Sequence, residues 1–168
     1  MPAFLPFECD GFLLRELRPQ DAPALAEIEF DPGVKQFLHL PSLSQEEWVK
    51  QFDASSYGGF AVEVDGQLAG RGSLLRYGVG RKGYAEIAVV IGRAWWGKRI
   101  GRGVAAALID IAFLHQNAKG VVGVVHPEHH ASIALLCALG FRKRGVVQSP
   151  PKPWQSGHLI YRLPRRGA

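Results

Sequence analysis

The sequence predicts a mixed α/β (α+β) fold, in which about four helices accompany a mostly antiparallel central sheet of about six to seven strands. Three observations support this class. The chain has 168 residues, of which 47% are hydrophobic, and this suits one domain over residues 1–168. Residues 60–75 are typical of a hairpin around an Asp65-Gly66 turn. From residue 84 onward, strand and helix patterns alternate.

The segments before the hairpin predict one strand and two helices. Residues 12–17 (FLLREL) form a short apolar run typical of a strand, and residues 18–21 (RPQD) open a helical pattern. Ser44 and Glu47 form a capping box, which predicts a second helix over about residues 45–53.

The segments after the hairpin predict further strands from apolar runs and two helices from helical periodicity, with Gly140 suited to a helix C-cap. The last two strand segments could close the sheet as an antiparallel pair. The expected strands are 84–91, 121–125, 141–148 and 157–163, and the expected helices are 104–114 and 131–138.

Composition narrows the class of protein. The net charge of +5 is compatible with an anionic ligand, but the basic runs 142–144 and 165–166 lack interleaved aromatic residues, so no nucleic-acid partner is expected.

Cys9 and Cys137 are far apart, without metal-ligand spacing, which favours a reducing compartment. The start of the chain lacks the pattern of a secretion signal, and no segment approaches the roughly 20 apolar residues of a membrane span. We therefore expect a cytoplasmic protein without a membrane partner.

Residues 93–103 (RAWWGKRIGRG) combine glycines, basic side chains and a helix start, which together favour an anion site. Free N–H groups of a first helical turn point at a bound anion, and the helix dipole contributes up to about 2 kcal/mol. The spacing matches neither a dinucleotide fingerprint nor a Walker-type phosphate loop. By itself, the segment could equally be a solvated loop whose glycines only make a turn.

Five stretches, taken in order, carry a resemblance to a known family. They are the start at 14–21, PSLSQEEW at 41–48, AEIAVVIGRAWWGKRIG at 85–101, HPEHHAS at 126–132 and LGF at 139–141. They resemble the GNAT superfamily of acyl-CoA-dependent N-acetyltransferases, in particular the branch similar to ribosomal-protein N-terminal acetyltransferases. The resemblance covers about residues 12–163, and it implies a sheet that is splayed at an acetyl-CoA site.

The resemblance implies that acetyl-CoA is the co-substrate and that the Trp-Gly-Lys triplet 96–98 opens the loop that holds its pyrophosphate. The strand before this loop would bind the pantetheine arm and face the thioester oxygen with its backbone. The residues assigned to acetyl-CoA in this way are Val89, Val90, Ile91, Trp96, Gly97, Lys98, Arg99, Ile100, Gly101, Arg102, Gly103, His129 and Ser132.

The chain departs from the family pattern at three positions. Arg99 replaces the usual glycine after the triplet, so either its side chain points outward to the phosphates or the loop is remodelled. His129 replaces an asparagine three residues before the helix serine. Leu136 replaces the tyrosine that many relatives use to protonate the departing thiolate, so a tyrosine acid is not available there.

Acetyl transfer from a thioester to a primary amine needs a neutral nucleophile, a stabilised oxyanion and a leaving thiolate. Glu86 is the candidate base, directly or through water, but it could instead pair with an arginine at the strand end. Ser132 could protonate the thiolate or be the N-cap of its helix. His126, His129 and His130 are further candidate bases, and no metal site is expected because no Cys or carboxylate completes a ligand set.

The expected reaction is direct attack of the amine in a ternary complex. A catalytically weak acetyl-CoA sensor is the alternative that keeps the fold, and Arg99 and Leu136 make it conceivable; nucleic-acid binding is the other alternative. Helix 1, residues 31–43 and residues 148–157 are expected to shape the acceptor cleft, with Pro150 to Trp154 as one wall. The few proton-handling groups favour an α-amine of a protein, peptide or small molecule, and a homodimer is left open.

Overall fold

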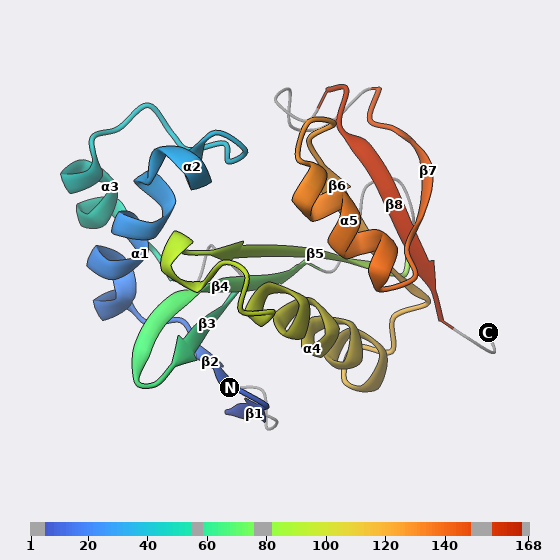
Figure 1. Ribbon diagram of the computed structural model, residues 1–168, viewed down its shortest axis with the longest axis horizontal. Coiled ribbons are helices and arrows are strands. Elements are labelled where there is room, and N and C mark those ends of the chain that lie inside the picture. The colour runs from blue at the N-terminus through green and yellow to red at the C-terminus, as the bar shows by residue number, and fades with distance from the viewer. Residues whose placement is uncertain (1–5, 55–58, 76–81, 149–155, 166–168) are drawn as a thin grey trace. The chain divides into compact units, whose positions relative to one another are not determined.

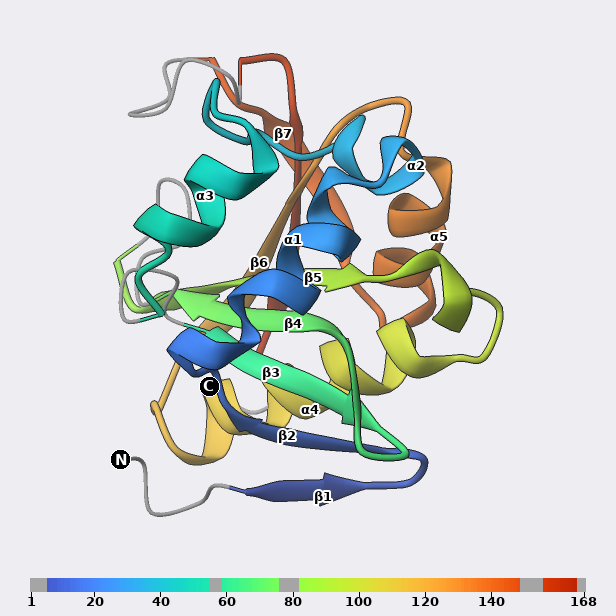
Figure 2. The same ribbon diagram turned by 90° about the vertical axis from the view of Figure 1, so that its left-hand side faces the viewer.

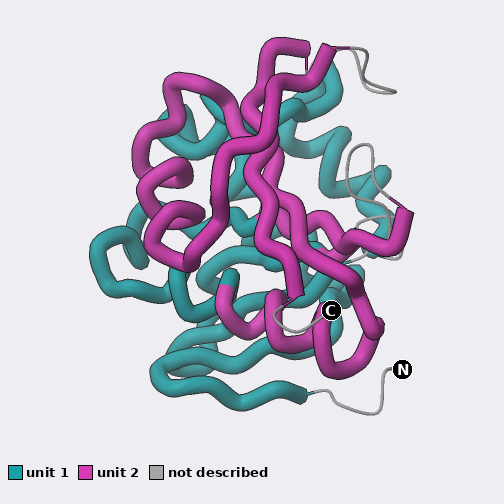
Figure 3. Tube along the Cα trace, turned by 90° about the vertical axis from the view of Figure 1, so that its right-hand side faces the viewer, with its two compact units in different colours: residues 1–73, 89–105 teal, residues 74–88, 106–168 magenta. Residues whose placement is uncertain are grey.

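The computed structural model describes residues 6–54, 59–75, 82–148 and 156–165. The chain forms two compact units, coloured separately in Figure 3. Unit 1 comprises Met1–Ser73 and Val89–Ala105, and unit 2 comprises Leu74–Ala88 and Ala106–Ala168. A single domain over residues 1–168 stays a prediction.

Unit 1 contains a run of antiparallel strands, each paired with the next along the chain (Figure 2). The predicted hairpin between the third and fourth of these strands is confirmed. Asp65 and Gly66 have φ angles of 50° and 75°, the left-handed values of a two-residue hairpin turn. The strands are β1 (Phe7–Cys9), β2 (Phe12–Glu16), β3 (Gly59–Val64) and β4 (Gln67–Leu75).

A β-bulge interrupts the pairing of β3 with β4. Val62 faces Gly70 while Glu63 faces Leu68, so Ala69 is the extra residue. A side chain on Gly70 would overlap the backbone carbonyl oxygen of Val90, which leaves glycine as the residue that fits. The bulge therefore lies directly against the last part of β5 (Tyr84–Ile91).

Three helices of unit 1 lie in sequence between β2 and β3 (Figure 1). They are α1 (Ala22–Phe30), preceded by a 3-10 turn at Pro19–Asp21, α2 (Pro32–Lys35) and α3 (Gln45–Gln51). The predicted capping box of α3 is confirmed, because Ser44 Oγ accepts from the Glu47 N–H at 3.2 Å and the Glu47 carboxylate accepts from the Ser44 N–H at 2.9 Å. Trp48 of α3 packs edge-on against Phe30 of α1, with 6.1 Å between ring centroids.

An ion-pair cluster fixes the start of α1 against the strands. The Arg15 guanidinium donates to both carboxylate oxygens of Asp21 at 2.8 Å and to Glu63 at 2.7 Å. Burial by itself would raise the pKa of the Asp21 carboxyl, but the bonds from Arg15 and from the Arg18 N–H outweigh it, and the pKa is lowered. Arg15 is thus the residue that allows Asp21 to be buried and charged.

Unit 2 contains the first part of β5, the last three strands and the last helix. Its helix, α5 (His130–Ala138), ends in a Schellman motif, in which the Gly140 N–H donates to Cys137 and the Phe141 N–H to Leu136. Gly140 has a φ of 88°, which confirms its predicted role at the end of this helix. The strands are β6 (Gly120–Val125), antiparallel to β8 (Leu159–Pro164), which is in turn antiparallel to β7 (Arg142–Val146).

The fold class is confirmed as a mixed α/β fold with a mostly antiparallel, open sheet in the order β1-β2-β3-β4-β5-β6-β8-β7. Within the described residues the sheet has eight strands, and five α-helices accompany it, one more of each than we expected. The additional strand is β1, which turns into β2 at Asp10-Gly11, and the additional helix is the single turn α2. Both are too short for residue periodicity to indicate them.

The helix α4 (Ile100–Leu114) begins four residues before the predicted start at 104. Its first turn contains two glycines, Gly101 and Gly103, and these weaken the sequence signal for a helix. Among the described residues, no helix is long and apolar enough to cross a membrane.

Candidate functional site

The strand β5 pairs with β6 over only part of its length. The parallel ladder joins Tyr84 to Gly120, Ala85 to Val121 and Glu86 to Val122, and in the described pairing it ends there. The rest of β5, which includes Val89, Val90 and Ile91, therefore keeps the backbone groups of this edge outside the β6 ladder. This is the arrangement that a strand needs in order to bind a ligand through its backbone.

The loop after β5 turns sharply before α4 begins. Gly97 and Arg99 both have left-handed φ angles, 76° and 63°. The Arg99 carbonyl accepts the first helical bond, from the Gly103 N–H at 3.1 Å. The N–H groups of Ile100, Gly101 and Arg102 have no hydrogen-bond acceptor among the residues that the structure describes. The start of α4 thus presents donors and the positive end of its dipole to any bound anion.

The residues of this loop differ in what they can offer a ligand. Lys98, Arg99 and Arg102 are exposed, and the Lys98 ammonium lies 4.6 Å from the centre of the Trp95 ring. Ile100 is buried, so only its backbone is available. A Cβ on Gly103 would lie 2.6 Å from the Phe12 ring, so this glycine is required for packing of α4 against β2.

Arg99 occupies a backbone conformation that favours glycine. The left-handed region costs an ordinary residue about 1–2 kcal/mol, which explains why glycine suits this position. The sequence left two possibilities for Arg99, an outward-pointing side chain or a remodelled loop. In the structure the loop makes its left-handed turn at Gly97 and Arg99 with the arginine in place.

We expect Arg99→Gly to raise the free energy of unfolding by about 0.5–1 kcal/mol, since relief of backbone strain exceeds the added entropy of the unfolded glycine. Urea unfolding measures the change. Arg99→Ala is the matched control, because it removes the guanidinium and keeps the Cβ. Equal stability of the two variants would contradict the prediction, because relief of strain at residue 99 would then only offset the entropy of the unfolded glycine.

The predicted catalytic residues lie in unit 2. Glu86 is half-buried on β5, at the last pair of the β6 ladder. Ser132 is the third residue of α5, and the residue at the N-cap is His129. The alternative that Ser132 is the N-cap is therefore wrong, because the helix begins three residues earlier than that alternative requires.

His129, like His126, is half-buried. Burial lowers its pKa, and the neighbouring His126 and His130 lower it further. His129 is consequently neutral near pH 7 and able to accept a proton. His126 Nδ1 accepts from the Glu128 N–H at 3.2 Å, which fixes the turn before α5. Among the described residues, no group of three or more His, Cys, Asp or Glu side chains is arranged to hold a metal ion.

Leu136 is buried against β6, where a Cβ on Gly123 would lie 2.9 Å from its side chain. Because Gly123 has no side chain, it leaves space on β6 that Leu136 fills. The position that many relatives give to a tyrosine is thus part of the apolar packing here.

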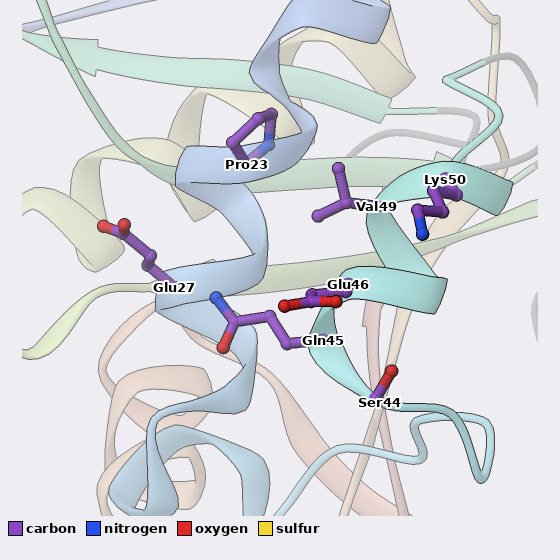
Figure 4. Close-up of a pocket in the computed structure, with 7 residues that line it drawn as sticks. All are labelled: Pro23, Glu27, Ser44, Gln45, Glu46, Val49 and Lys50. Atoms are coloured by element: carbon purple, nitrogen blue, oxygen red, sulfur yellow. The ribbon is translucent and has the colours of Figure 1, made fainter.

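A surface pocket of about 710 Å³ lies between α1 and α3 (Figure 4). None of the predicted site residues lines it. Figure 4 shows Pro23 and Glu27 on one side and residues 44–50 on the other. The lining residues are Pro23, Glu27, Ser44, Gln45, Glu46, Val49 and Lys50. The predicted acceptor wall from Pro150 to Trp154 lies outside the described residues.

Sequence analysis missed several polar residues of unit 1. Glu29 is completely buried in α1 and pairs with Arg71 of β4. The available signal was the spacing of Glu29 four residues after Leu25, on the apolar stripe of the helix. Asp31 caps α2 by accepting from the Gly33 N–H at 2.8 Å, and the Asp-Pro-Gly sequence was the signal for this turn.

Comparison with known proteins identifies the family. Residues 12–142 match the family model of the acetyltransferase (GNAT) domain. The chain is 26% identical over 159 residues to the uncharacterized N-acetyltransferase p20 of Bacillus licheniformis, covering 88% of this chain and 86% of that one.

Solved structures share the fold. RimJ of Mycobacterium smegmatis, in complex with CoA-disulfide, superposes with a TM-score of 0.77 at 20% identity and covers 91% of this chain and 81% of its own. A Vibrio cholerae protein assigned as a ribosomal-protein-serine acetyltransferase gives 0.79 at 18% identity, covering 98% and 99%. AAC(6')-Ib, in complex with paromomycin and acetyl-CoA, gives a TM-score of 0.77 at 16% identity, covering 94% of this chain and 95% of its own. The resemblance drawn from the sequence is confirmed, and the chain belongs to the GNAT acetyltransferase family.

Proposed function

We propose that the protein is an N-acetyltransferase that moves the acetyl group of acetyl-CoA to a primary amine by direct attack in a ternary complex. The observation that carries the proposal is the start of α4, where Gly97 and Arg99 turn the chain so that the N–H groups of residues 100–102 are free to bind a pyrophosphate. The exposed Lys98, Arg99 and Arg102 would add charge around it.

Related structures support acetyl-CoA as the co-substrate, since RimJ of Mycobacterium smegmatis holds CoA-disulfide and AAC(6')-Ib holds acetyl-CoA. In this chain the part of β5 outside the β6 ladder, Val89 to Ile91, would bind the pantetheine arm. A backbone N–H of this segment would stabilise the thioester oxygen as it becomes an oxyanion.

Conversion of the acceptor ammonium to an amide releases two protons, of which one reaches the thiolate and the other passes to solvent. Glu86 or a water next to it would take the ammonium proton, after which the nitrogen lone pair attacks the thioester carbon. The carbon–sulfur bond then breaks as the tetrahedral intermediate collapses. The nitrogen loses its second proton as the intermediate collapses, and Ser132, directly or through water, would relay a proton to the thiolate. The neutral His129 is the second candidate for the base.

The acceptor that demands least of these groups is an α-amine. An alkyl amine with a pKa of about 10.4 is neutral in roughly one of 2,500 molecules at pH 7, whereas an α-amine at about 7.7–8.0 is neutral about a tenth of the time. A catalytically weak acetyl-CoA sensor is the alternative. It would bind acetyl-CoA through the same loop, so only a measurement of thiol release separates it from the enzyme.

Acetyl-CoA titration by calorimetry tests the proposal. We expect Gly101→Val to weaken acetyl-CoA binding at least about tenfold, equivalent to about 1.4 kcal/mol, because the side chain blocks close approach of the phosphates. Gly145→Val is the matched control, since a Cβ at residue 145 meets no atom within 4 Å. If the wild-type protein produces no heat and no thermal stabilisation with millimolar acetyl-CoA, the proposed function is wrong.

A panel of amines then identifies the acceptor. Thiol release from acetyl-CoA is measured with peptides that have free N-termini, with polyamines, with aminoglycosides and with amino acids. The proposal that α-amines are preferred requires the peptides or amino acids to give the highest kcat/KM.

A further inference from the structure

Three close approaches join the loop after β5 to the helices α1 and α2, all within unit 1. A Cβ on Gly92 would lie 3.2 Å from Ile28 of α1, so this helix packs directly on the end of the strand. The Arg93 guanidinium lies 3.6 Å from the Asp31 carboxylate, at the N-cap of α2. The third approach is between Trp96 and Gly33.

Gly33 provides space rather than an unusual backbone. Its φ angle is outside the left-handed region, so an alanine could adopt the same conformation. A Cβ there would lie 3.1 Å from the Asp31 carboxylate, 3.2 Å from the Arg93 Cδ and 3.5 Å from the far edge of the Trp96 ring. Gly33 therefore forms a notch in α2 that receives side chains from the loop.

Trp96 is held at both ends. Its indole N–H donates to the carbonyl of Ile91 at 2.7 Å, which fixes the last residue of β5. The ring edge reaches the Gly33 notch, although 51% of the residue is exposed. An exposed indole gains little from burial, so its hydrogen bond and its place beside Gly33 are what determine its orientation.

We propose that Trp96 is a positioning residue that couples the binding of acetyl-CoA to the conformation of α2, and so to acceptor affinity. This inference rests on the proposed function, in which β5 and the loop hold the cofactor while α1 and the segment after it shape the acceptor cleft. Acetyl-CoA bound to residues 97–103 reduces the motion of the loop. Because the Trp96 ring contacts Gly33, the motion of α2 is reduced as well. The acceptor then binds to a wall that is already fixed.

Hydrogen exchange tests the contact without any ligand. The reporter amides are those of residues 34–38, whose N–H groups are bonded within the α2 turn. We expect Trp96→Phe, which removes the N–H donor and shortens the ring, to speed exchange of these amides about fivefold or more. Gly33→Ala should do the same, because its Cβ would crowd the Asp31 carboxylate and the Arg93 side chain in the notch, at 3.1 and 3.2 Å. Gly145→Ala is the matched control and should leave the rates unchanged. Wild-type rates in both test variants would overturn the proposal.

The second arm adds saturating acetyl-CoA. In the wild-type protein we expect slower exchange both at residues 101–103 and at residues 34–38. In both Trp96→Phe and Gly33→Ala the protection at 34–38 should be lost, and in Gly33→Ala, which lies outside the cofactor loop, the protection at 101–103 should persist. Protection at 34–38 that survives in both variants overturns the coupling. Absence of protection at 101–103 in the wild-type protein is a different result, because it contradicts the proposed function, while the ligand-free arm still decides the contact.

Discussion

Replacing Arg71 with methionine is expected to lower the free energy of unfolding by about 3–5 kcal/mol, since it leaves a buried carboxylate without its counter-charge. Glu29 is fully buried, and one of its oxygens accepts from Arg71. Its other oxygen has no hydrogen-bond partner among the described residues. Arg71 also donates to the buried Ser73 hydroxyl at 3.1 Å, so its loss affects two polar groups. Chemical denaturation provides the measurement.

Two further variants interpret this result. The double variant Glu29→Leu with Arg71→Met should be more stable than Arg71→Met alone, because a buried ion pair replaced by apolar groups of similar volume is often neutral or better. Arg93→Met is the matched control, since its ion pair with Asp31 is exposed and should contribute at most about 1 kcal/mol. If Arg71→Met is no more destabilising than Arg93→Met, the buried pair does not contribute as the geometry indicates.

Glu86→Gln is expected to lower kcat by about 100-fold or more while acetyl-CoA affinity stays nearly unchanged. The reason is that the amide keeps the shape of the side chain but cannot accept the acceptor proton. The loss of rate on the acidic side of the pH profile should disappear as well. Steady-state kinetics across pH, with the best amine from the panel, measures both effects.

Glu8→Gln is the control for this substitution, because Glu8 is also a strand carboxylate but is exposed on β1. It should keep wild-type kinetics. Wild-type kcat and an unchanged pH profile in Glu86→Gln would make Glu86 a structural residue, in line with the arginine pairing that the sequence also allowed. His129, His130 or a chain of water molecules would then be the candidates for the base.

Local signals of the sequence predicted most of the fold. The Asp65-Gly66 turn, the Ser44 capping box and the Gly140 helix end each depend on a few adjacent residues, and each is found in the structure. Asp10-Gly11 was the same kind of turn signal, but the three-residue strand before it was too short to be recognised. Local chemistry therefore predicts turns and caps better than it predicts very short elements.

The candidate site was predictable only where it depends on local chemistry. The glycine and basic residues of the loop gave the position of the α4 start, whereas its left-handed turn at Arg99 could be seen only in the backbone. The Gly33 notch and the Glu29–Arg71 pair join residues far apart in sequence, so no local pattern reveals them. The start of α5 shows the same limit. The turn before this helix makes His129 the N-cap, and the sequence did not reveal that Ser132 would lie inside the helix.

The bulge in β4 restricts how this protein can diverge. Because any side chain at residue 70 would collide with the Val90 carbonyl, a mutation there requires β5 to withdraw along with the backbone from Val89 to Ile91. The segment from Val89 to Ile91, which we propose to bind the pantetheine arm, therefore depends on a glycine at residue 70 of the neighbouring strand, although that glycine is not itself one of the proposed site residues.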